Sequence, residues 1–242
     1  SQLSSEALRA FSSTQFAALS ATQVRALTTT QIENLEASDI AEFTTTQIAG
    51  LATTQVRDLN ETAIAALDTT QLAALTTTQI KSLTTTNLVS LADTQIAALS
   101  TTQIANLATS QVAALDTTNV VALTATQIGA LTSAQVVALG STNFAQLDET
   151  QIGGLTSTQM RSLSTTQIAN IDADQVASFS TSQLTQLSAT QMRALSTENL
   201  SALDTTQMGA LTATQIASLT TTQISGLVAG DMAELTTTQV QA

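Results

Sequence analysis

Two apolar positions recur every eight residues along this 242-residue chain. In the segment 100–107, with the sequence Ser-Thr-Thr-Gln-Ile-Ala-Asn-Leu, these positions are Ile104 and Leu107. We label the eight columns a to h from this segment, so that Ser100 is a, Gln103 is d, Ile104 is e and Leu107 is h. Because e and h are three residues apart, they share one face of a helix.

The apolar columns hold throughout the chain. Column h is Leu, Phe or Ile at all 30 positions from Leu3 to Leu235, and column e is apolar at all 30 positions from Leu8 to Val240. Such constancy predicts that e and h form the buried interior, with b, c and f facing outward. Disorder does not require two fully apolar columns, so the Thr- and Ala-rich composition does not indicate a disordered segment.

The polar columns predict a helix start in every repeat. Column a is Ser, Thr, Asp or Asn in 24 of 30 repeats and column d is Gln in 22, which together spell a capping box. Leu99 and Ile104 flank this cap at the positions of a hydrophobic staple. Departures such as Ala7 and Ala63 in column d, or Gly140 and Val228 in column a, are expected to weaken single caps only.

A continuous helix is excluded by its own periodicity. Eight residues advance by roughly 800°, so each repeat would stand about 80° out of register with the last. We therefore expect a helix of about one and a half turns, then a corner at columns g, h and a. Column g is mostly Ala, Ser, Gly or Asn, which suits a crowded corner.

Packing between repeats must stabilise these helices, because six residues are too few for a helix to be stable in water. The predicted fold is all-α: a solenoid of about 30 octapeptide repeats, one short capped helix per repeat and about three repeats per coil, forming a triangular prism with a solid Ile/Leu core. A β-solenoid is the alternative, since Thr, Ile and Val favour strands. Its weakness is the five-residue spacing of Leu99 and Ile104, which puts them on opposite faces of a strand.

The octapeptide resembles a known family. Its motif, [S/T/D]-T-T-Q-[I/V/L/M]-A-A-L, covers essentially the whole chain and is similar to that of the bacterial ultra-short tandem-repeat proteins whose triangular helical prism is likened to a Toblerone bar. The resemblance implies the triangular solenoid fold and a secreted or cell-surface setting. It implies no catalytic residue.

The charge and the apolar pattern of the chain limit the kinds of partner that it can have. The formal net charge of −12, with five Arg and Lys81 as the only cations, argues against nucleic acid and anionic membranes as partners. No apolar run approaches the roughly 20 residues of a membrane span. Twelve of the 18 acids lie in columns a, b and c, and all six bases lie in column f, as the helix dipole favours.

The sequence contains no recognisable catalytic or metal-binding motif. There is no Cys or His, which removes the usual ligands of zinc, haem and iron–sulfur clusters. No calcium-loop motif is present, and the acidic pairs Asp148 with Glu149 and Asp172 with Asp174 are expected to cap helices. We predict no catalytic, cofactor-binding or metal-binding residues and no cofactor, and hence no enzyme.

Of three classes of function that the sequence could serve, an enzyme is the least favoured. The preferred one is a structural spacer or display rod of a bacterial surface or secreted protein; the alternative is an adhesin or an ice- or ligand-binding module that uses outward Thr faces. Residues 1–242 are expected to form a single array cut from a longer protein. Its ends should associate by stacking into a homo-oligomer, with partly exposed apolar residues there: Leu3, Leu8, Phe11, Leu235 and Val240.

Overall fold

The fold is all-helical, as a computed structural model that describes residues 4–241 shows. In this range the structure holds one α-helix of four to six residues in each octapeptide and no β-strand. The prediction of a short helix per repeat is confirmed, and the β-solenoid alternative is wrong.

The chain divides into two compact units, Ser1–Leu123 and Thr124–Ala242. The octapeptide register runs through the division without an insertion or a deletion. That residues 1–242 form a single array stays a prediction, and each unit is described by itself.

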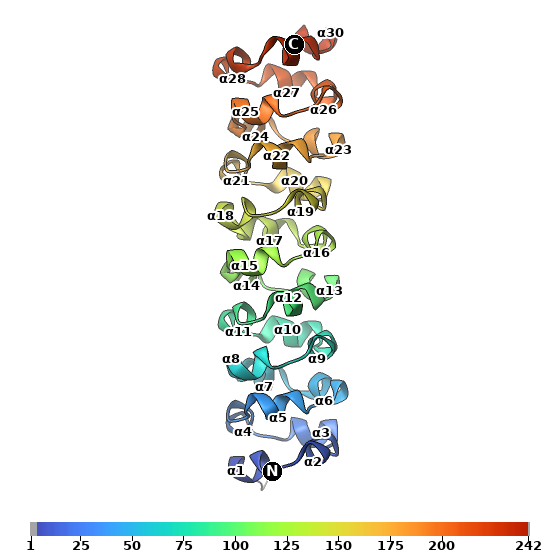
Figure 1. Ribbon diagram of the computed structural model, residues 1–242, viewed down its shortest axis with the longest axis vertical. Coiled ribbons are helices and arrows are strands. Elements are labelled where there is room, and N and C mark those ends of the chain that lie inside the picture. Colours follow the sequence, from blue (N-terminus) through green and yellow to red (C-terminus); the bar gives the residue numbers. More distant parts are fainter. Residues whose placement is uncertain (1–3, 242) are drawn as a thin grey trace. The chain divides into compact units, whose positions relative to one another are not determined.

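The first unit contains the described helices α1(Ser5–Arg9), α2(Ser13–Ala17), α3(Ala21–Arg25), α4(Thr29–Glu33), α5(Ala37–Ala41), α6(Thr45–Gly50), α7(Thr53–Arg57), α8(Glu61–Ala65), α9(Thr69–Ala74), α10(Thr77–Ser82), α11(Thr85–Val89), α12(Asp93–Ala98), α13(Thr101–Ala105), α14(Thr109–Ala114) and α15(Thr117–Val121) (Figure 1).

The second unit contains the described helices α16(Ala125–Ala130), α17(Ser133–Ala138), α18(Gly140–Phe144), α19(Glu149–Gly153), α20(Ser157–Ser162), α21(Thr165–Ala169), α22(Ala173–Ala177), α23(Thr181–Leu184), α24(Ala189–Ala194), α25(Thr197–Ser201), α26(Thr205–Ala210), α27(Ala213–Ala217), α28(Thr221–Gly226), α29(Ala229–Ala233) and α30(Thr237–Val240).

The column a residue is the N-cap of each described helix except α18, where Leu139 precedes a helix that begins at Gly140. In α13 the Ser100 hydroxyl accepts a bond from the Gln103 N–H at 3.2 Å, and the Gln103 Oε1 accepts one from the Ser100 N–H at 2.8 Å. Where column a is Ala, as at Ala52, only the second of these bonds remains, at 2.7 Å. Gly140 and Val228 likewise provide no side-chain cap, as the sequence predicts.

The corner is crowded, which explains the small residues of column g. At Gly154, the last residue before the corner that follows α19, an added Cβ would lie 2.4 Å from the carbonyl oxygen of Ala125 at the start of α16. At Gly50 it would lie 2.7 Å from the Cβ of Ala21 in α3. At these two positions a larger residue would therefore push two stacked helices apart.

Helices three apart in sequence stack on one another, which gives three helices per turn of the solenoid. In the first unit this holds for pairs such as α3 with α6, α6 with α9 and α9 with α12, and in the second for α16 with α19, α21 with α24 and α24 with α27. The prediction of about three repeats per coil is confirmed within each unit.

Columns e and h fill the interior of both units. From Leu27 to Leu211 every residue of column h has an exposed fraction of 7% or less, and so does every residue of column e from Leu8 to Ile216. Most residues of columns b, c and f are exposed. The inward and outward columns are therefore those that the sequence predicts.

The end residues behave less uniformly than expected. Phe11 and Leu235 are half-buried and Val240 is 66% exposed, as predicted, but the prediction for Leu8 is wrong, because its side chain is fully buried. Column e faces the following coil, so the next helices already cover Leu8. Leu3 lies outside the described residues.

Candidate functional site

The buried polar side chains of this protein lie in column d, and most of them are glutamines. Gln103 is only 3% exposed, although its capping role needs no burial. While its Oε1 holds the Ser100 N–H, its Nε2 donates to the carbonyl oxygens of Leu72 and Leu75, both at 2.9 Å. One side-chain amide thus joins the start of α13 to the end of α9, four repeats earlier.

This glutamine bridge recurs at fixed spacing. Its Nε2 donates to the column e carbonyl 31 positions earlier and to the column h carbonyl 28 positions earlier, as in Gln47 to Phe16 and Leu19 and in Gln239 to Met208 and Leu211. The same pair of bonds is made by Gln55, Gln71, Gln79, Gln103, Gln111, Gln159, Gln183, Gln191, Gln215 and Gln223.

The bridges provide hydrogen-bond donors for backbone carbonyls that short helices leave unpaired. The last carbonyls of a helix have no partner within it, and here they are buried at the corner. Because each helix packs on the helix three repeats earlier, its first turn lies over the corner between that helix and the one before it. The column d amide is therefore in place to bond the carbonyls of that corner.

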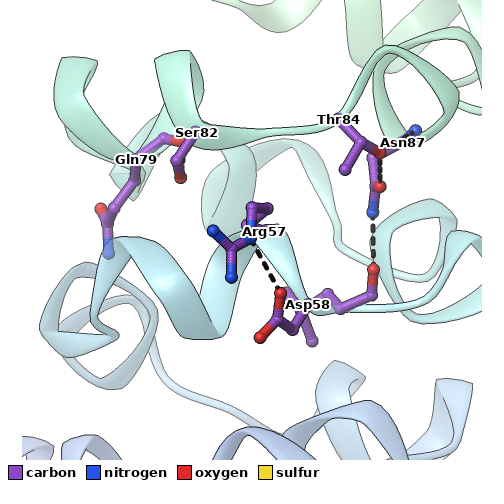
Figure 2. A network of polar contacts seen from close by, with 7 residues as sticks. Arg57, Asp58, Gln79, Ser82, Thr84 and Asn87 are labelled. Atoms are coloured by element: carbon purple, nitrogen blue, oxygen red, sulfur yellow. Dashed lines mark hydrogen bonds and ion pairs between the residues drawn. The ribbon is translucent and has the colours of Figure 1, made fainter.

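Shorter amides in column d make a reduced bridge. The Nδ2 of Asn87 donates to the carbonyl of Leu59 at 2.7 Å, and the Nδ2 of Asn199 to the carbonyl of Ile171 at 3.0 Å. Figure 2 shows Asn87 beside the hydroxyl of Thr84, its column a partner, and Gln79 of the preceding repeat extended toward the coil below. One methylene less reaches the h carbonyl but not the e carbonyl.

The repeat with Ala63 in column d is bridged from a different position. The column a residue Asn60 accepts the Ala63 N–H at 2.8 Å through Oδ1, and its Nδ2 donates to the carbonyls of Glu33 at 3.0 Å and Leu35 at 3.2 Å. Ala63 weakens the cap, as expected, because no column d side chain accepts the Asn60 N–H and the capping box is incomplete. It also lacks the bridging amide, which Asn60 replaces.

The two aspartates of column d face donors that stand 30 positions earlier. Asp231 accepts from the Val228 N–H at 3.0 Å and from the Ser201 hydroxyl at 2.8 Å. Asp39 accepts from the Glu36 N–H at 2.9 Å; burial raises its pKa, and the charge of Arg9 partly opposes that rise. A carboxylate cannot donate to the corner carbonyls, so each Asp needs a cation or hydroxyl beside it.

The acidic pairs singled out in the sequence meet in one open groove of the second unit. The groove is lined by Leu147, Asp148, Glu149, Thr150, Asp172, Asp174 and Gln175. Asp148 and Asp172 each use an Oδ1 to accept their own helix's Gln N–H, at 2.7 and 2.8 Å. They cap helices, as predicted, and within residues 4–241 no group of three or more acids is arranged to hold a metal ion.

The outer surface carries rows of threonine. On the stacked helices α4, α7, α10 and α13, columns b and c are both Thr, in the pairs Thr29–Thr30, Thr53–Thr54, Thr77–Thr78 and Thr101–Thr102. We call this surface of the first unit the threonine ladder. Exposed Arg57 and Lys81 of column f lie on the same stack.

Membrane-spanning helices are also absent from the described range, where every helix is too short to cross a bilayer. The prediction of no membrane insertion agrees with this finding.

The comparisons with known proteins identify the repeat. A family model described as the ALTTAQ repeat matches residues 1–29, 53–85, 104–141, 176–213 and 187–221, together more than half of the chain. No curated protein matches the sequence.

Proposed function

The chain belongs to the ALTTAQ repeat family, and from that membership we propose that it is a non-enzymatic structural module, a rigid spacer or display rod. One observation carries the proposal. The recurring side chains of each repeat are used to support the array itself: e and h fill the interior, a caps the helix, and d bridges four repeats back. Each coil is thereby tied to the preceding coils by packing and by buried hydrogen bonds.

The setting that we propose is a bacterial cell surface or the secreted fraction. The likeness of the octapeptide to the bacterial ultra-short repeat proteins supports it, and the net charge of −12 disfavours nucleic acid as a partner. Cell fractionation, with protease added to intact cells, tests this setting. Recovery of the protein in the cytoplasmic fraction, with the added protease unable to cleave it in intact cells, would contradict it.

Rigidity can be tested within the first unit. The chain has no native Cys, so Thr29→Cys and Thr101→Cys place two nitroxide labels on exposed positions of α4 and α13, three stacking steps apart. At 8 to 10 Å per step we expect one narrow distance distribution centred on about 24–30 Å, before allowing for the label arms. Electron–electron double resonance measures it, and a broad distribution like that of a Gly/Ser linker would contradict a rigid spacer.

A second candidate is a binding module that uses the threonine ladder, because this ladder repeats identical hydroxyl pairs on four stacked helices. Ice recrystallisation and glycan-array assays test it with Thr54→Glu/Thr78→Glu, at exposed column c positions of the ladder. The matched control is Thr62→Glu/Thr86→Glu, which adds the same charge to exposed column c positions of the stack formed by α8 and α11. Activity in the wild type that is lost only in the first variant would favour binding over a spacer alone.

A further inference from the structure

The corner between α17 and α18 has a backbone conformation that no other described corner shares. Gly140, its column a residue, has a φ of +73°, and within residues 4–241 no other residue has a positive φ. An added Cβ at Gly140 would meet nothing within 4 Å, so lack of space does not require glycine here. The backbone does, because glycine adopts positive φ without the steric cost that a side chain brings.

The peptide bond between Leu139 and Gly140 is turned over relative to the preceding corner. At that corner ψ of Leu131 is 144° and φ of Thr132 is −69°. Here ψ of Leu139 is −26° and φ of Gly140 is +73°. Large opposite changes in these two angles rotate the planar peptide unit and leave the chain path nearly unchanged, as between type I and type II turns. The Leu139 carbonyl and the Gly140 N–H are therefore reversed.

A bridge bond is missing where this carbonyl is turned. Gln167, 28 positions after Leu139, donates to the Val136 carbonyl at 2.9 Å, but among residues 4–241 no bond joins it to the Leu139 carbonyl. Gln159 and Gln175, one repeat to either side, bond the column h carbonyls of their own corners at 2.7 and 2.6 Å. The turned peptide thus removes one acceptor from the bridge that starts at α21.

The groups that fix this peptide in other repeats are reduced at this corner. The column a glycine provides no side-chain cap for α18, and column d is Asn143, which is one methylene shorter than Gln. The Asn119 Oδ1 lies 3.4 Å from the Asp116 N–H, whereas the Gln55 Oε1 holds the Ala52 N–H at 2.7 Å. The three other repeats with Asn in column d all have Thr, Asp or Ser in column a.

We propose that the Leu139–Gly140 peptide is a two-state switch within the second unit. In the left-handed state, which the structure shows, Gln167 makes one bridge bond; in the regular state the peptide is turned over and Gln167 makes both. Glycine adopts either sign of φ about equally readily, so the residue itself favours neither state. The flip rotates one peptide plane and leaves the interior side chains Val136 and Phe144, both 0% exposed, in place.

The switch connects two stacked helices. Helix α18 packs against α21, whose first turn contains Gln167. A flip at the start of α18 therefore adds or removes a hydrogen bond to α21 without unfolding either helix. This device is independent of the spacer function proposed above, and it gives the second unit a corner that changes its hydrogen bonding in the folded state.

Selective labelling isolates this peptide for NMR. Leu139–Gly140 is the only Leu–Gly pair in the sequence, so ¹³C′-leucine with ¹⁵N-glycine labels one peptide bond on both sides. Relaxation dispersion of the Gly140 ¹⁵N measures the populations of two interconverting states, and the Leu139 ¹³C′ shift reports whether that carbonyl accepts a hydrogen bond. Gly129 and Gly153, which lack a positive φ, are the internal references.

Three variants test the direction of the switch. Asn143→Gln lengthens the column d side chain enough to hold the Gly140 N–H, so the ratio of the regular to the left-handed state should rise by about two- to tenfold. Gln167→Glu keeps the acceptor for its own cap but loses the donor to the corner carbonyl, so the ratio should fall by a similar factor. Asn199→Gln, in the repeat capped by Ser196, is the matched control and should leave the ratio unchanged.

Circular dichroism checks that each variant keeps the wild-type helix content. Two states at Gly140 in the wild type, with populations that Asn143→Gln and Gln167→Glu shift in opposite directions, would support the switch. A single Gly140 resonance without dispersion at every temperature at which the protein stays folded would overturn it. So would a ratio that Asn143→Gln leaves unchanged.

Discussion

At the scale of single residues, the column d side-chain amide is the group that connects one repeat to an earlier one by hydrogen bonds. Gln103 holds three backbone groups at once, the Ser100 N–H and the carbonyls of Leu72 and Leu75. All three are buried or partly buried, so water does not replace the amide at low cost. This polar side chain is buried because the buried backbone N–H and C=O groups around it need hydrogen-bond partners.

A first prediction follows for Gln103. Gln103→Leu should lower the free energy of unfolding by about 2–4 kcal/mol despite its added apolar surface, because it leaves three backbone groups unsatisfied. Gln103→Glu keeps the acceptor and loses the donor, so it should be destabilised at neutral pH and recover as falling pH protonates the buried carboxyl. Urea denaturation at several pH values measures both, and a stabilised Leu variant would mean that the bridge contributes nothing.

Asp39 carries the second prediction at this scale. Its folded-state pKa is raised, first by burial, so the folded state binds a proton more tightly than the unfolded state. Stability should therefore fall as pH rises from the ordinary Asp value of 3.8 through the raised pKa, and stay lower above it.

Asp39→Gln should remove that pH dependence and add about 0.5–1.5 kcal/mol at pH 7, since the amide gains carbonyl partners. Arg9 keeps its ion pair with Glu36 in this variant. Thermal unfolding at pH 4 and pH 7 compares the two proteins, and Glu42→Gln is the matched control, because Glu42 is a half-buried acid in the same repeat. An equal change in the control would show that net charge alone is responsible.

The capping role of column d could be predicted from the sequence, but its bridging role was missed. A signal for it was present. A capping box accepts Glu as readily as Gln, yet column d contains no Glu among its 30 residues, although Glu6, Glu61 and Glu198 occur in columns b and c. Absence of Glu from this column indicates that most repeats use the amide N–H, and a donor that the cap itself does not need indicates an acceptor in another part of the chain packed against it.

At the scale of helices, the spacing of the bridge fixes the coil. Offsets of 28 and 31 residues are possible only if the helix start in one repeat lies over the corner four repeats earlier, which requires three helices per turn. The eight-residue period predicts the length of each helix and its buried face. The period alone does not fix how many helices close a turn, so the expected three per coil is established only by contacts between helices, such as Gly154 with Ala125.

The Asn60–Ala63 pair gives a prediction about the helix α8. Asn60→Ser should keep the cap but lose the bonds to Glu33 and Leu35, at a cost of about 1–2 kcal/mol. Ala63→Gln alone should gain little, since the Leu35 carbonyl, 28 positions before it, already accepts from the Asn60 amide. The double variant should recover the wild-type value, and a double-mutant cycle in urea measures the coupling. Additive effects of the two changes would contradict replacement of one amide by the other.

Packing of columns e and h carries the fourth prediction. Leu107→Ala should lower the free energy of unfolding by about 2–5 kcal/mol, because the side chain is buried at the corner after α13. Thr101→Ala, on an exposed position of the same helix, should change it by less than about 0.5 kcal/mol. Chemical denaturation compares the two, and similar losses in both would mean that the inward and outward columns are misassigned.

At the scale of the molecule, stability depends on neighbours rather than on any one repeat. A helix of five residues is unstable alone, so each coil requires the coils on either side of it. The sequence predicts this dependence, because no repeat differs enough to serve as a cap. It does not reveal that the array has a direction, with column d turned toward preceding coils and column e toward following ones, since that orientation arises only when helices stack.

Within the 242-residue chain, the last described helices should be less stable than the first ones, which is the last prediction. In the first unit α1 to α3 have their column e side chains fully covered, whereas in the second unit α28 to α30 leave theirs 37–66% exposed. Local opening costs least where the fewest apolar contacts are lost. Amide hydrogen exchange, measured by NMR at low protein concentration, should therefore be faster in α28–α30 than in α1–α3. Met232→Ala should widen this difference little, because that side chain is already 44% exposed, whereas Phe16→Ala, which opens a cavity beneath α2, should reverse it. Equal protection of both ends in the wild type would show that the exposed column e residues contribute as much as the buried ones, and that the array has no weak end.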